Sequence, residues 1–335
     1  MGKSIQDMIE RANHSRFRAE KKGFYESFFL RANHPRKPQA FWIRYTVFEP
    51  RDPAAQTIGE LWATWFDGDT GQHVSVKSEW PISQCRFDKD RFRVNVGEAV
   101  LEDKRAAGKA GAKDIIEWDL VLSGDSTPLF LLPPGLYDTG FPKAKALVGL
   151  PLAVFNGRLI VNGSVVDIHG WVGSQNHNWG VKHTDSYAWG QVAGFDNSAD
   201  TFFELATARL KFGPVYTPRM TLMVLRHQGR EYKLNSIAQS LKAFGRFDYF
   251  SWNFKSRTRE IQIQGTIVAG RKDFVGLRYY NPPGGIKHCL NTKIASCRIT
   301  IESSRGASET LETTSRAAFE IFTDDHHGHG VPVYA

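Results

Sequence analysis

The chain has 335 residues, and its 43 Lys and Arg against 35 Asp and Glu give a formal net charge of +8. At roughly 100–200 residues per domain this length favours two domains, and a hydrophobic content of 41% allows each of them a core. The basic residues are scattered and do not cluster with stacking aromatic residues, so we expect no nucleic-acid partner.

The cysteines and the apolar segments of the sequence indicate in which cellular compartment the protein is expected. Cys85, Cys289 and Cys297 are odd in number and irregular in spacing, which fits a reducing compartment. The first 23 residues lack the apolar core of a signal peptide, and no run of 18 apolar residues predicts a membrane span. We therefore expect a cytoplasmic protein without an integral membrane segment. Peripheral membrane contact and the oligomeric state stay open.

The first half of the chain is expected to be a short helix followed by strands. Ile5, Met8 and Ile9 would share one face of an amphipathic helix over residues 4–13. From Glu26 onward apolar residues recur with a period of two, which is typical of half-buried strands. The strands expected in this half cover 26–31, 40–48, 59–66, 73–80, 86–94 (as a pair), 115–122, 147–155, 157–161 and 163–168.

Glycine-containing segments are expected to separate these strands. Ala106–Ala112 (AAGKAGA) is interpreted as a flexible loop. Asn156-Gly157 and Asn162-Gly163 each predict a tight hairpin turn, because both residues of the pair readily adopt a positive φ.

The second half continues with strands at short intervals. Gln228-Gly229-Arg230 and Gly270–Asp273 are expected to be turns, and Ser236–Phe244 is the best candidate for a helix. The expected strands are 191–195, 201–211, 220–227, 231–234, 247–255, 260–269, 274–280, 292–302 and 317–322. Strands at this spacing predict an all-β barrel or sandwich.

The two halves resemble each other weakly. Trp118 is followed by Pro133-Pro134-Gly135, and Trp252, which lies 134 residues after Trp118, is followed by Pro282-Pro283-Gly284. Two β-barrels in tandem would explain this repeat. The alternative is a coincidence between two β-rich halves.

The stretch Gly170–Gly190 (GWVGSQNHNWGVKHTDSYAWG) is unusually rich in polar and aromatic residues. We expect it to join the two barrels and to line a pocket. Alternation along a strand places Asn176 and Asn178 on one face and His177 and Trp179 on the other.

Two residues are candidates for acid–base chemistry. A histidine titrates near neutral pH, so His177 could act as a general acid, and neighbouring aromatic faces could stabilise a developing cation. Glu204, in the middle of an apolar strand, is the carboxylate with the most plausible inward position. An alternative stays open, in which the aromatic residues only fill a barrel and the histidine satisfies backbone groups.

Metal and cofactor sites are not expected. His177 and His183 are six residues apart with no cysteine nearby, which argues against zinc. His326-His327-Gly328-His329 is interpreted as an ordered loop or a frayed end. No glycine-rich phosphate-binding motif occurs, so no nucleotide cofactor is expected.

Gln175–Gly180 (QNHNWG) followed by Tyr187–Gly190 (YAWG) resembles the signature of the carotenoid 1,2-hydratase (hydroxyneurosporene synthase) and AttH-type superfamily, to which tocopherol cyclases are related. The resemblance implies two lipocalin-like barrels that hold an apolar, often terpenoid, ligand. His177 and Trp179 match the family's His-x-Trp pair, which is linked to protonation of an isoprenoid double bond. The hydratases carry a Tyr-x-Asp on a following strand, where this chain has Glu204-Leu205-Ala206, so only Glu204 could replace the missing Asp.

The sequence thus predicts an all-β fold of two tandem lipocalin-like (calycin) antiparallel barrels with few short helices. The expected domains are an N-terminal extension (1–22), a first barrel (23–172) and a second barrel (173–335).

We expect a hydrophobic, isoprenoid- or lipid-like small molecule to bind in a barrel cavity, with acid-catalysed hydration, cyclisation or isomerisation as the enzymatic hypothesis. The alternatives are a non-catalytic lipid or terpenoid carrier and a structural or interaction protein. The catalytic hypothesis requires His177 and Glu204 to face one cavity. The expected ligand-binding residues are Asn176, Asn178, Trp179, His183, Tyr187 and Trp189.

Overall fold

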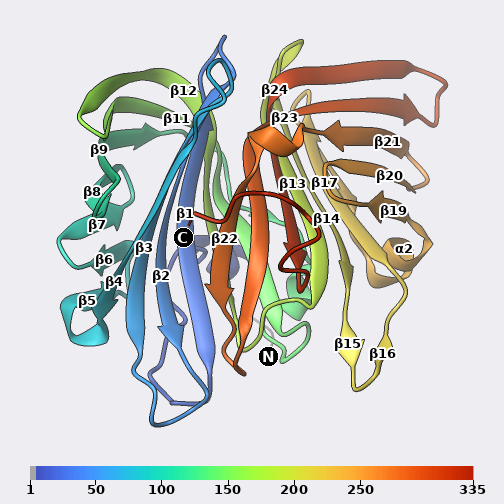
Figure 1. The fold of residues 1–335 in the computed structure, drawn as a ribbon. Coiled ribbons are helices and arrows are strands. Elements are labelled where there is room, and N and C mark those ends of the chain that lie inside the picture. The colour runs from blue at the N-terminus through green and yellow to red at the C-terminus, as the bar shows by residue number, and fades with distance from the viewer. Residues whose placement is uncertain (1–4, 335) are drawn as a thin grey trace.

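The computed structural model describes residues 5–334, which form two large antiparallel sheets lying side by side (Figure 1). In this part of the chain the first sheet has 12 strands. They are β1 (Phe24–Asn33), β2 (Gln39–Glu49), β3 (Ile58–Asp67), β4 (Val74–Pro81), β5 (Cys85–Phe87), β6 (Arg93–Val96), β7 (Ala99–Glu102), β8 (Arg105–Gly111), β9 (Ile115–Ser123), β10 (Leu129–Phe130), β11 (Ala144–Val161) and β12 (Ser164–Gly180).

The second sheet has 10 strands within the described residues, and a small hairpin forms a sheet of its own. The strands of the second sheet are β13 (Ser186–Phe195), β14 (Ser198–Arg209), β17 (Met220–His227), β18 (Arg230–Leu234), β19 (Phe244–Phe247), β20 (Ser251–Arg257), β21 (Ile261–Val268), β22 (Val275–Tyr280), β23 (Ile286–Ser303) and β24 (Ser308–Thr323). The hairpin is β15 (Lys211–Phe212) and β16 (Val215–Tyr216), and the helical elements are α1 (Ile5–Glu10), α2 (Ile237–Lys242) and the 3-10 turns η1 (Ile82–Gln84), η2 (Pro134–Leu136) and η3 (Arg271–Asp273). The predicted all-β class with few short helices is confirmed.

The two sheets repeat one topology. The first runs β4-β3-β2-β1-β12-β11-β9-β8 and the second β18-β17-β14-β13-β24-β23-β21-β20. The two tryptophans that suggested the repeat are not equivalent in it. Trp118 lies in β9, beside β11, whereas Trp252 lies in β20, one strand further from the corresponding β23. The repeat therefore lies in the strand order and not in the spacing of these residues.

The junction between the sheets falls after the end of β12. The expected division between residues 172 and 173 lies inside this strand, and the sheets part between Gly180 and Ser186. In the expected N-terminal extension, residues 1–4 lie outside the described part of the chain. The remainder holds α1 and packs on the first sheet through the buried side chain of Ala12.

Residues 106–112 do not form the expected flexible loop, because Arg105–Gly111 is strand β8, paired with β7 and β9. Its small residues allow close packing. A Cβ atom on residue 108 would lie 2.5 Å from the Cβ atom of Ala99 and 2.8 Å from the Trp118 ring. The alanine and glycine content therefore reflects a crowded barrel wall and not a mobile connection.

The expected turn at Asn156-Gly157 is also wrong, because both residues lie inside β11. The pairing register shifts between Phe155 and Gly157. Gly157 has φ +128°, and a Cβ atom there would lie 2.1 Å from the carbonyl oxygen of Asp119. This glycine therefore marks a β-bulge in one long strand.

Other local expectations agree with the structure. Asn162-Gly163 and Gln228-Gly229 close the β11–β12 and β17–β18 hairpins, and all four residues have positive φ, as tight two-residue hairpin turns require. The expected helix at 236–244 is α2, capped by the Ser236 side chain. The turn expected at Gly270–Asp273 is the 3-10 turn η3.

Each sheet encloses its own packed core, and a third apolar cluster joins the two. Tyr45, Trp118 and Trp171 are fully or almost fully buried in the first core, and Trp252 and Phe319 in the second. The cluster between the sheets contains Phe29, Ala40, Trp42, Trp62 and Phe66 from the first sheet and Trp189, Val275, Leu277, Tyr279, Cys289, Ile294, Ala318 and Phe322 from the second. Strands near the junction are therefore buried on both faces.

Neither helix of the described chain is long enough to cross a bilayer. Helices α1 and α2 have six residues each, and no helix among residues 5–334 meets the length and apolarity of a membrane span.

Candidate functional site

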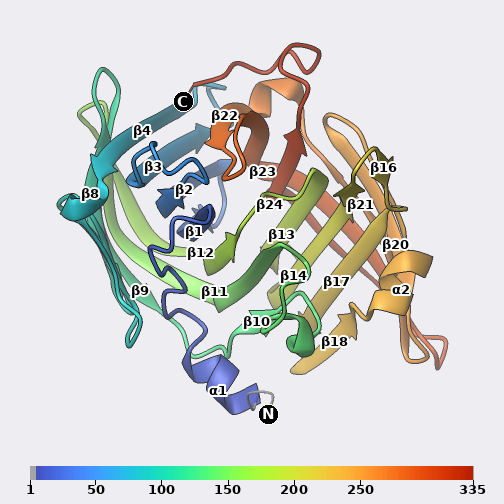
Figure 2. The same ribbon diagram turned by 90° about the horizontal axis from the view of Figure 1, so that it is seen from below.

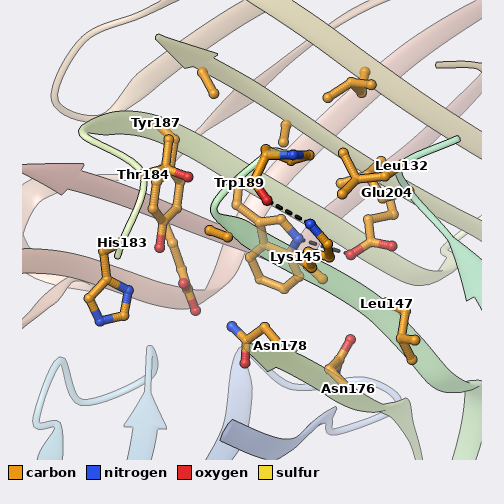
Figure 3. Close-up of a pocket in the computed structure, with 18 of the residues that line it drawn as sticks. Leu132, Lys145, Leu147, Asn176, Asn178, His183, Thr184, Tyr187, Trp189 and Glu204 are labelled. Carbon is orange, nitrogen blue, oxygen red and sulfur yellow. Dashed lines mark hydrogen bonds between the residues drawn. The ribbon is translucent and has the colours of Figure 1, made fainter. Parts of the chain in front are cut away.

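A cavity of about 220 Å³ lies between the two sheets and not inside either barrel (Figure 3). Both sheets contribute to its walls, which are mostly apolar. The first sheet and its loops supply Tyr25, Phe29, Trp42, Arg44, Leu131, Leu132, Pro133, Leu136, Phe141, Pro142, Ala144, Lys145, Ala146, Leu147, Asn176, His177 and Asn178. The remainder of the chain supplies His183, Thr184, Tyr187, Trp189, Glu204, Ala206, Ala208, Leu210, Met220, Leu222, Ile237, Ser240, Tyr279 and Glu320.

The stretch Gly170–Gly190 forms the centre of this site. It comprises the end of β12, a five-residue connection and the start of β13. Asn176, Asn178, His183, Tyr187 and Trp189 of this stretch all line the cavity. The first sheet thus brings its last strand, and the second sheet its first strand, to opposite walls of one cavity.

Glu204 is the acidic residue of the cavity wall whose pKa is raised by its surroundings. Its side chain is 2% exposed, and its Oε1 accepts a hydrogen bond of 3.0 Å from the indole Nε1–H of Trp189 (Figure 3). Its Oε2 has no hydrogen-bond partner among the described residues. Burial disfavours the ionised form and raises the pKa of Glu204 to about 7, although the Trp189 bond opposes this. Near neutral pH this carboxyl group can therefore hold and release a proton.

The amide of Asn176 is fixed in a network between the sheets. Its Oδ1 accepts from Gln191 Nε2 at 2.9 Å, and its Nδ2 donates to Ser174 Oγ at 2.9 Å. Ser174 in turn donates to Gln191 Oε1 at 2.6 Å. In the described chain Asn178 differs, because its Oδ1 is buried without a hydrogen-bond partner. Asn178 is therefore the amide in this wall that has spare capacity to accept a hydrogen bond.

Aromatic rings form one wall around His183. The imidazole lies 3.9 Å from the Tyr25 ring and 5.3 Å from the Phe322 ring, measured between centroids. Tyr187 stacks on Phe322 at 5.1 Å. Burial lowers the pKa of His183 to about 3, and the nearby Arg44 contributes to this shift. His183 is therefore a neutral ring at physiological pH and acts here as part of an aromatic wall.

Several charged wall residues were not expected from the sequence. Arg44 places its guanidinium 4.2 Å from the centre of the Tyr279 ring. Glu320 forms an ion pair with Lys293, with 2.7 Å between Oε1 and Nζ, and the Lys293 side chain has no solvent exposure. Both Arg44 and Glu320 lie in strand segments that are buried on both faces. A charged residue within such an otherwise apolar strand is unusual, and this feature of the sequence could have indicated both residues.

His177 lies on the other side of β12 from the two asparagines. Its Nδ1 lies 2.7 Å from the Ala12 carbonyl oxygen and its Nε2 lies 2.9 Å from Glu26 Oε1. Its ring stacks on Phe28, a member of the first core, at 4.1 Å. Atoms of His177 line the cavity, but both ring nitrogens are occupied by protein partners on the opposite side.

Trp179 lies beside a different hollow. This second hollow, of about 280 Å³, is bounded by α1, by the chain that follows it and by Tyr137. The guanidinium of Arg16 lies 5.3 Å from the Trp179 ring centre. The structure thus separates Trp179, as well as the nitrogens of His177, from the cavity that contains Glu204.

No group of three or more His, Cys, Asp or Glu residues between residues 5 and 334 is arranged to hold a metal ion. The histidine-rich tail is an ordered loop in which Asp325 Oδ1 accepts from the backbone N–H groups of His327 and Gly328. His329 lies 3.1 Å from His288, Nε2 to Nδ1, and its own Nδ1 accepts from the backbone of Val331. The contact between His288 and His329 holds the C-terminal segment beside β23.

Comparison with known sequences finds relatives of unknown activity. No family model matches the chain. Two uncharacterized proteins, from the Mycobacterium tuberculosis strains CDC 1551/Oshkosh and ATCC 25618/H37Rv, are each 21% identical over 304 residues, which cover 90% of this chain and 88% of each relative.

Comparison with solved structures finds the same fold in two proteins of low identity. An AttH-type protein from Nitrosomonas europaea has a TM-score of 0.57 and 11% identity over 96% of this chain and 97% of its own. Kievitone hydratase from Nectria haematococca has a TM-score of 0.56 and 10% identity over 92% of this chain and 93% of its own. The predicted lipocalin-like β-barrel fold is therefore confirmed, and this chain shares it with both of these proteins.

Proposed function

We propose that this protein binds an apolar small molecule in the cavity between its sheets and that Glu204 protonates it, so that water is added to a carbon–carbon double bond. The observation that carries this proposal is a carboxyl group with a pKa of about 7 in the wall of a mainly apolar cavity. Kievitone hydratase, which shares the fold, is by its name an enzyme that adds water. An isoprenoid-like substrate is the finer form of this proposal.

The reaction needs three contributions from the chain. Protonated Glu204 transfers its proton to one alkene carbon, which leaves a positive charge on the other carbon. The faces of Trp189 and Tyr187 stabilise this charge, because aromatic rings present electron density to cations. Water then forms the new C–O bond, and its surplus proton returns to the Glu204 carboxylate, which restores the acid.

This assignment differs from the expectation that His177 donates the proton. A donor must reach the reacting atom within hydrogen-bonding distance, whereas both nitrogens of His177 already have partners on the far side of β12. His177 thus supports Glu26 and the N-terminal segment in the proposed scheme. A catalytic role for His177 stays a prediction.

Native mass spectrometry of the protein, before and after organic extraction, tests binding. We expect an apolar molecule to be retained and to be removed by extraction. Ala206→Phe, which fills the cavity, should abolish retention. Ala199→Phe places the same side chain at an exposed position of the same strand and should leave retention unchanged. Equal retention by both variants would contradict the cavity as the binding site.

Chemistry is tested separately with a panel of apolar alkenes in isotopically labelled water. We expect label in the product with the wild-type protein and none with Glu204→Gln, which keeps the shape of the side chain but has no acidic proton. If Glu204→Gln retains ligand and turns it over at the wild-type rate, Glu204 is not the acid. Retained ligand with no turnover in any protein would favour the carrier alternative.

A further inference from the structure

Three segments of the chain supply wall residues on one side of the cavity, and Figure 2 labels α2 and β16, which belong to two of them. They are the loop that ends at Phe141-Pro142, the β14–β17 connection from Leu210 to Met220, and α2 with the start of β19. Each segment supplies at least one cavity wall residue. An apolar molecule that enters the cavity from this side must therefore pass these segments.

Large apolar side chains are exposed on all three segments, and we call them together the mouth patch. They are Phe141 (44% exposed), Val215 (65%), Ile237 (50%), Leu241 (47%) and Phe244 (54%). Among the described residues these are five of the twelve large hydrophobic side chains that are markedly exposed. An uncovered apolar cluster of this kind is typical of a surface that contacts a partner or a membrane.

Helix α2 exposes two of these residues on one face. Ile237 and Leu241 are four residues apart in α2, so they share a face of the helix, and Phe244 follows at the start of β19. Ser240, one turn after Ile237 in the same helix, is buried and lines the cavity. Phe141 and Ile237 are both exposed and part of the cavity wall. The mouth patch and the cavity therefore meet at these two residues.

The charge around the mouth patch is mainly basic. Residues 139–144, 210–220 and 236–246 contain no Asp or Glu, and the exposed acidic residues Asp138 and Asp248 flank two of these segments. The basic residues are Lys143, Lys211, Arg219, Lys242 and Arg246. Exposed apolar residues surrounded by basic ones match the interface of an anionic bilayer, where aliphatic and aromatic groups enter the head-group region and Lys and Arg meet the lipid charge.

We propose that the mouth patch docks on an anionic lipid surface and that the apolar substrate enters the cavity from that surface. The substrate's route rests on the proposed function, but lipid binding itself does not. An anionic membrane is favoured over a protein partner because Phe141 and Ile237 belong to both the patch and the cavity wall, and because the charged residues around the patch are mainly basic. An apolar substrate would also be concentrated in the membrane, so docking would shorten its path through water.

Flotation with vesicles tests the docking. We expect the full chain to bind vesicles of mixed phosphatidylcholine and phosphatidylglycerol, to bind phosphatidylcholine vesicles at least tenfold more weakly, and to lose binding as salt is raised. Lys242→Glu/Arg246→Glu should weaken binding to the anionic vesicles by roughly tenfold or more. Leu241→Glu/Phe244→Glu should do the same, and neither of these residues lines the cavity.

A matched control lies at the other end of the sheets. Val165, at the start of β12, is 62% exposed, and Arg305 is exposed at the tip of the β23–β24 hairpin. Val165→Glu/Arg305→Glu makes the same kinds of change and should bind vesicles as the wild-type protein does. Equal weakening by this control, or undiminished binding by both mouth-patch variants, would overturn the proposal.

Two further measurements separate the possible failures. Sedimentation velocity would show whether the mouth patch instead joins two copies of this chain, because a dimer that the mouth-patch variants dissolve would also overturn the proposal. Glu204→Gln should bind vesicles normally, since it alters only the cavity. Loss of turnover with intact vesicle binding would then count against the proposed reaction alone, and loss of vesicle binding with intact turnover against the docking alone.

Discussion

The indole Nε1–H of Trp189 donates a hydrogen bond to Oε1 of Glu204 over 3.0 Å, between neighbouring strands β13 and β14. In the register of these strands Trp189 faces Ala206, and Glu204 faces Gln191. The two residues are therefore diagonal neighbours on one face of the sheet. This bond fixes the carboxyl group in the cavity wall, and its donor favours the ionised form that burial opposes.

The raised pKa of Glu204 predicts a pH-dependent stability. The pKa lies at about 7 in the folded protein against 4.5 for the ordinary side chain, so between these values the native state holds a proton that the unfolded state has lost. The free energy of unfolding should therefore fall as pH rises from about 4.5 to 7, by about 3 kcal/mol in total. Urea unfolding at several pH values measures this slope.

Glu204→Gln provides the control for this slope, because glutamine does not titrate. We expect the variant to lose the component of the slope that is due to this residue and to be more stable than the wild-type protein above pH 7. If both proteins show the same slope between pH 4.5 and 7, the carboxyl group titrates at an ordinary pKa. The acid role would then lose its physical basis.

Trp189→Phe should raise the pKa of Glu204 further. The substitution keeps an aromatic ring but removes the N–H donor that stabilises the carboxylate. Infrared spectroscopy measures the protonated carboxyl group directly through its C=O stretch, with Glu204→Gln identifying the band. An unchanged or lowered midpoint of this band in Trp189→Phe would contradict the proposed effect of the Trp189 bond.

Much of the fold follows from local patterns in the sequence. Alternating apolar residues identified most strands, Asn162-Gly163 identified a hairpin, and Ser236–Phe244 was identified as the segment that holds helix α2. The turn predicted at Gly157 and the loop predicted over the Ala/Gly-rich strand β8 were wrong, because the glycines in both places accommodate the close approach of other chain segments. Composition alone does not distinguish a glycine that allows a turn from one that allows tight packing.

The site was predictable in its location but not in its geometry. The polar and aromatic content of Gly170–Gly190 indicated the cavity, and Glu204 was identified as an inward carboxylate. Strand alternation separated Asn176 and Asn178 from His177, but it could not tell which face meets the second sheet. That choice depends on how the two sheets pack against each other. The same packing buries Arg44 and Glu320, which is why neither was expected.

His177→Ala should destabilise the protein. It leaves a space beside Phe28 and removes the partner of Glu26 Oε1, a buried carboxylate that also accepts from the Ser15 hydroxyl and the Arg16 backbone. A cavity in the core and a lost buried hydrogen bond together cost about 2–4 kcal/mol. Chemical denaturation measures this loss, and amide hydrogen exchange should show the greatest loosening around Ala12 and Ser15.

Turnover by the folded fraction of His177→Ala separates a structural role from a catalytic one. We expect this fraction to retain most of its activity, with the pH profile of the wild-type protein, since Glu204 is unchanged. His227→Ala is a suitable comparison, because His227 is also buried, hydrogen-bonded to Thr201 and paired with Glu309, but lies outside the cavity. Selective loss of turnover in His177→Ala would instead support the predicted role of His177 as a proton donor.

Arg31 is expected to hold the two sheets together through its shape and not through its charge alone. Its side chain has no solvent exposure, and it donates to the backbone oxygens of Gln191 at 3.3 Å and Arg316 at 2.9 Å and to the side chain of Asn33. It therefore bridges β1 of the first sheet to β13 and β24 of the second. A lysine keeps the charge, but its single ammonium group cannot span all of these acceptors.

Arg31→Lys should consequently lower the free energy of unfolding by about 1–3 kcal/mol, because buried acceptors lose their donors. Arg18→Lys, at a side chain that is 77% exposed, should change it by less than about 0.5 kcal/mol. Hydrogen exchange should locate the weakening in β13 and β24, and because these strands carry Trp189 and Glu320, retention of an apolar ligand should fall as well. If Arg31→Lys unfolds like the wild-type protein, packing of the apolar cluster alone is sufficient to hold the sheets. The cavity between them would then not depend on this buried guanidinium.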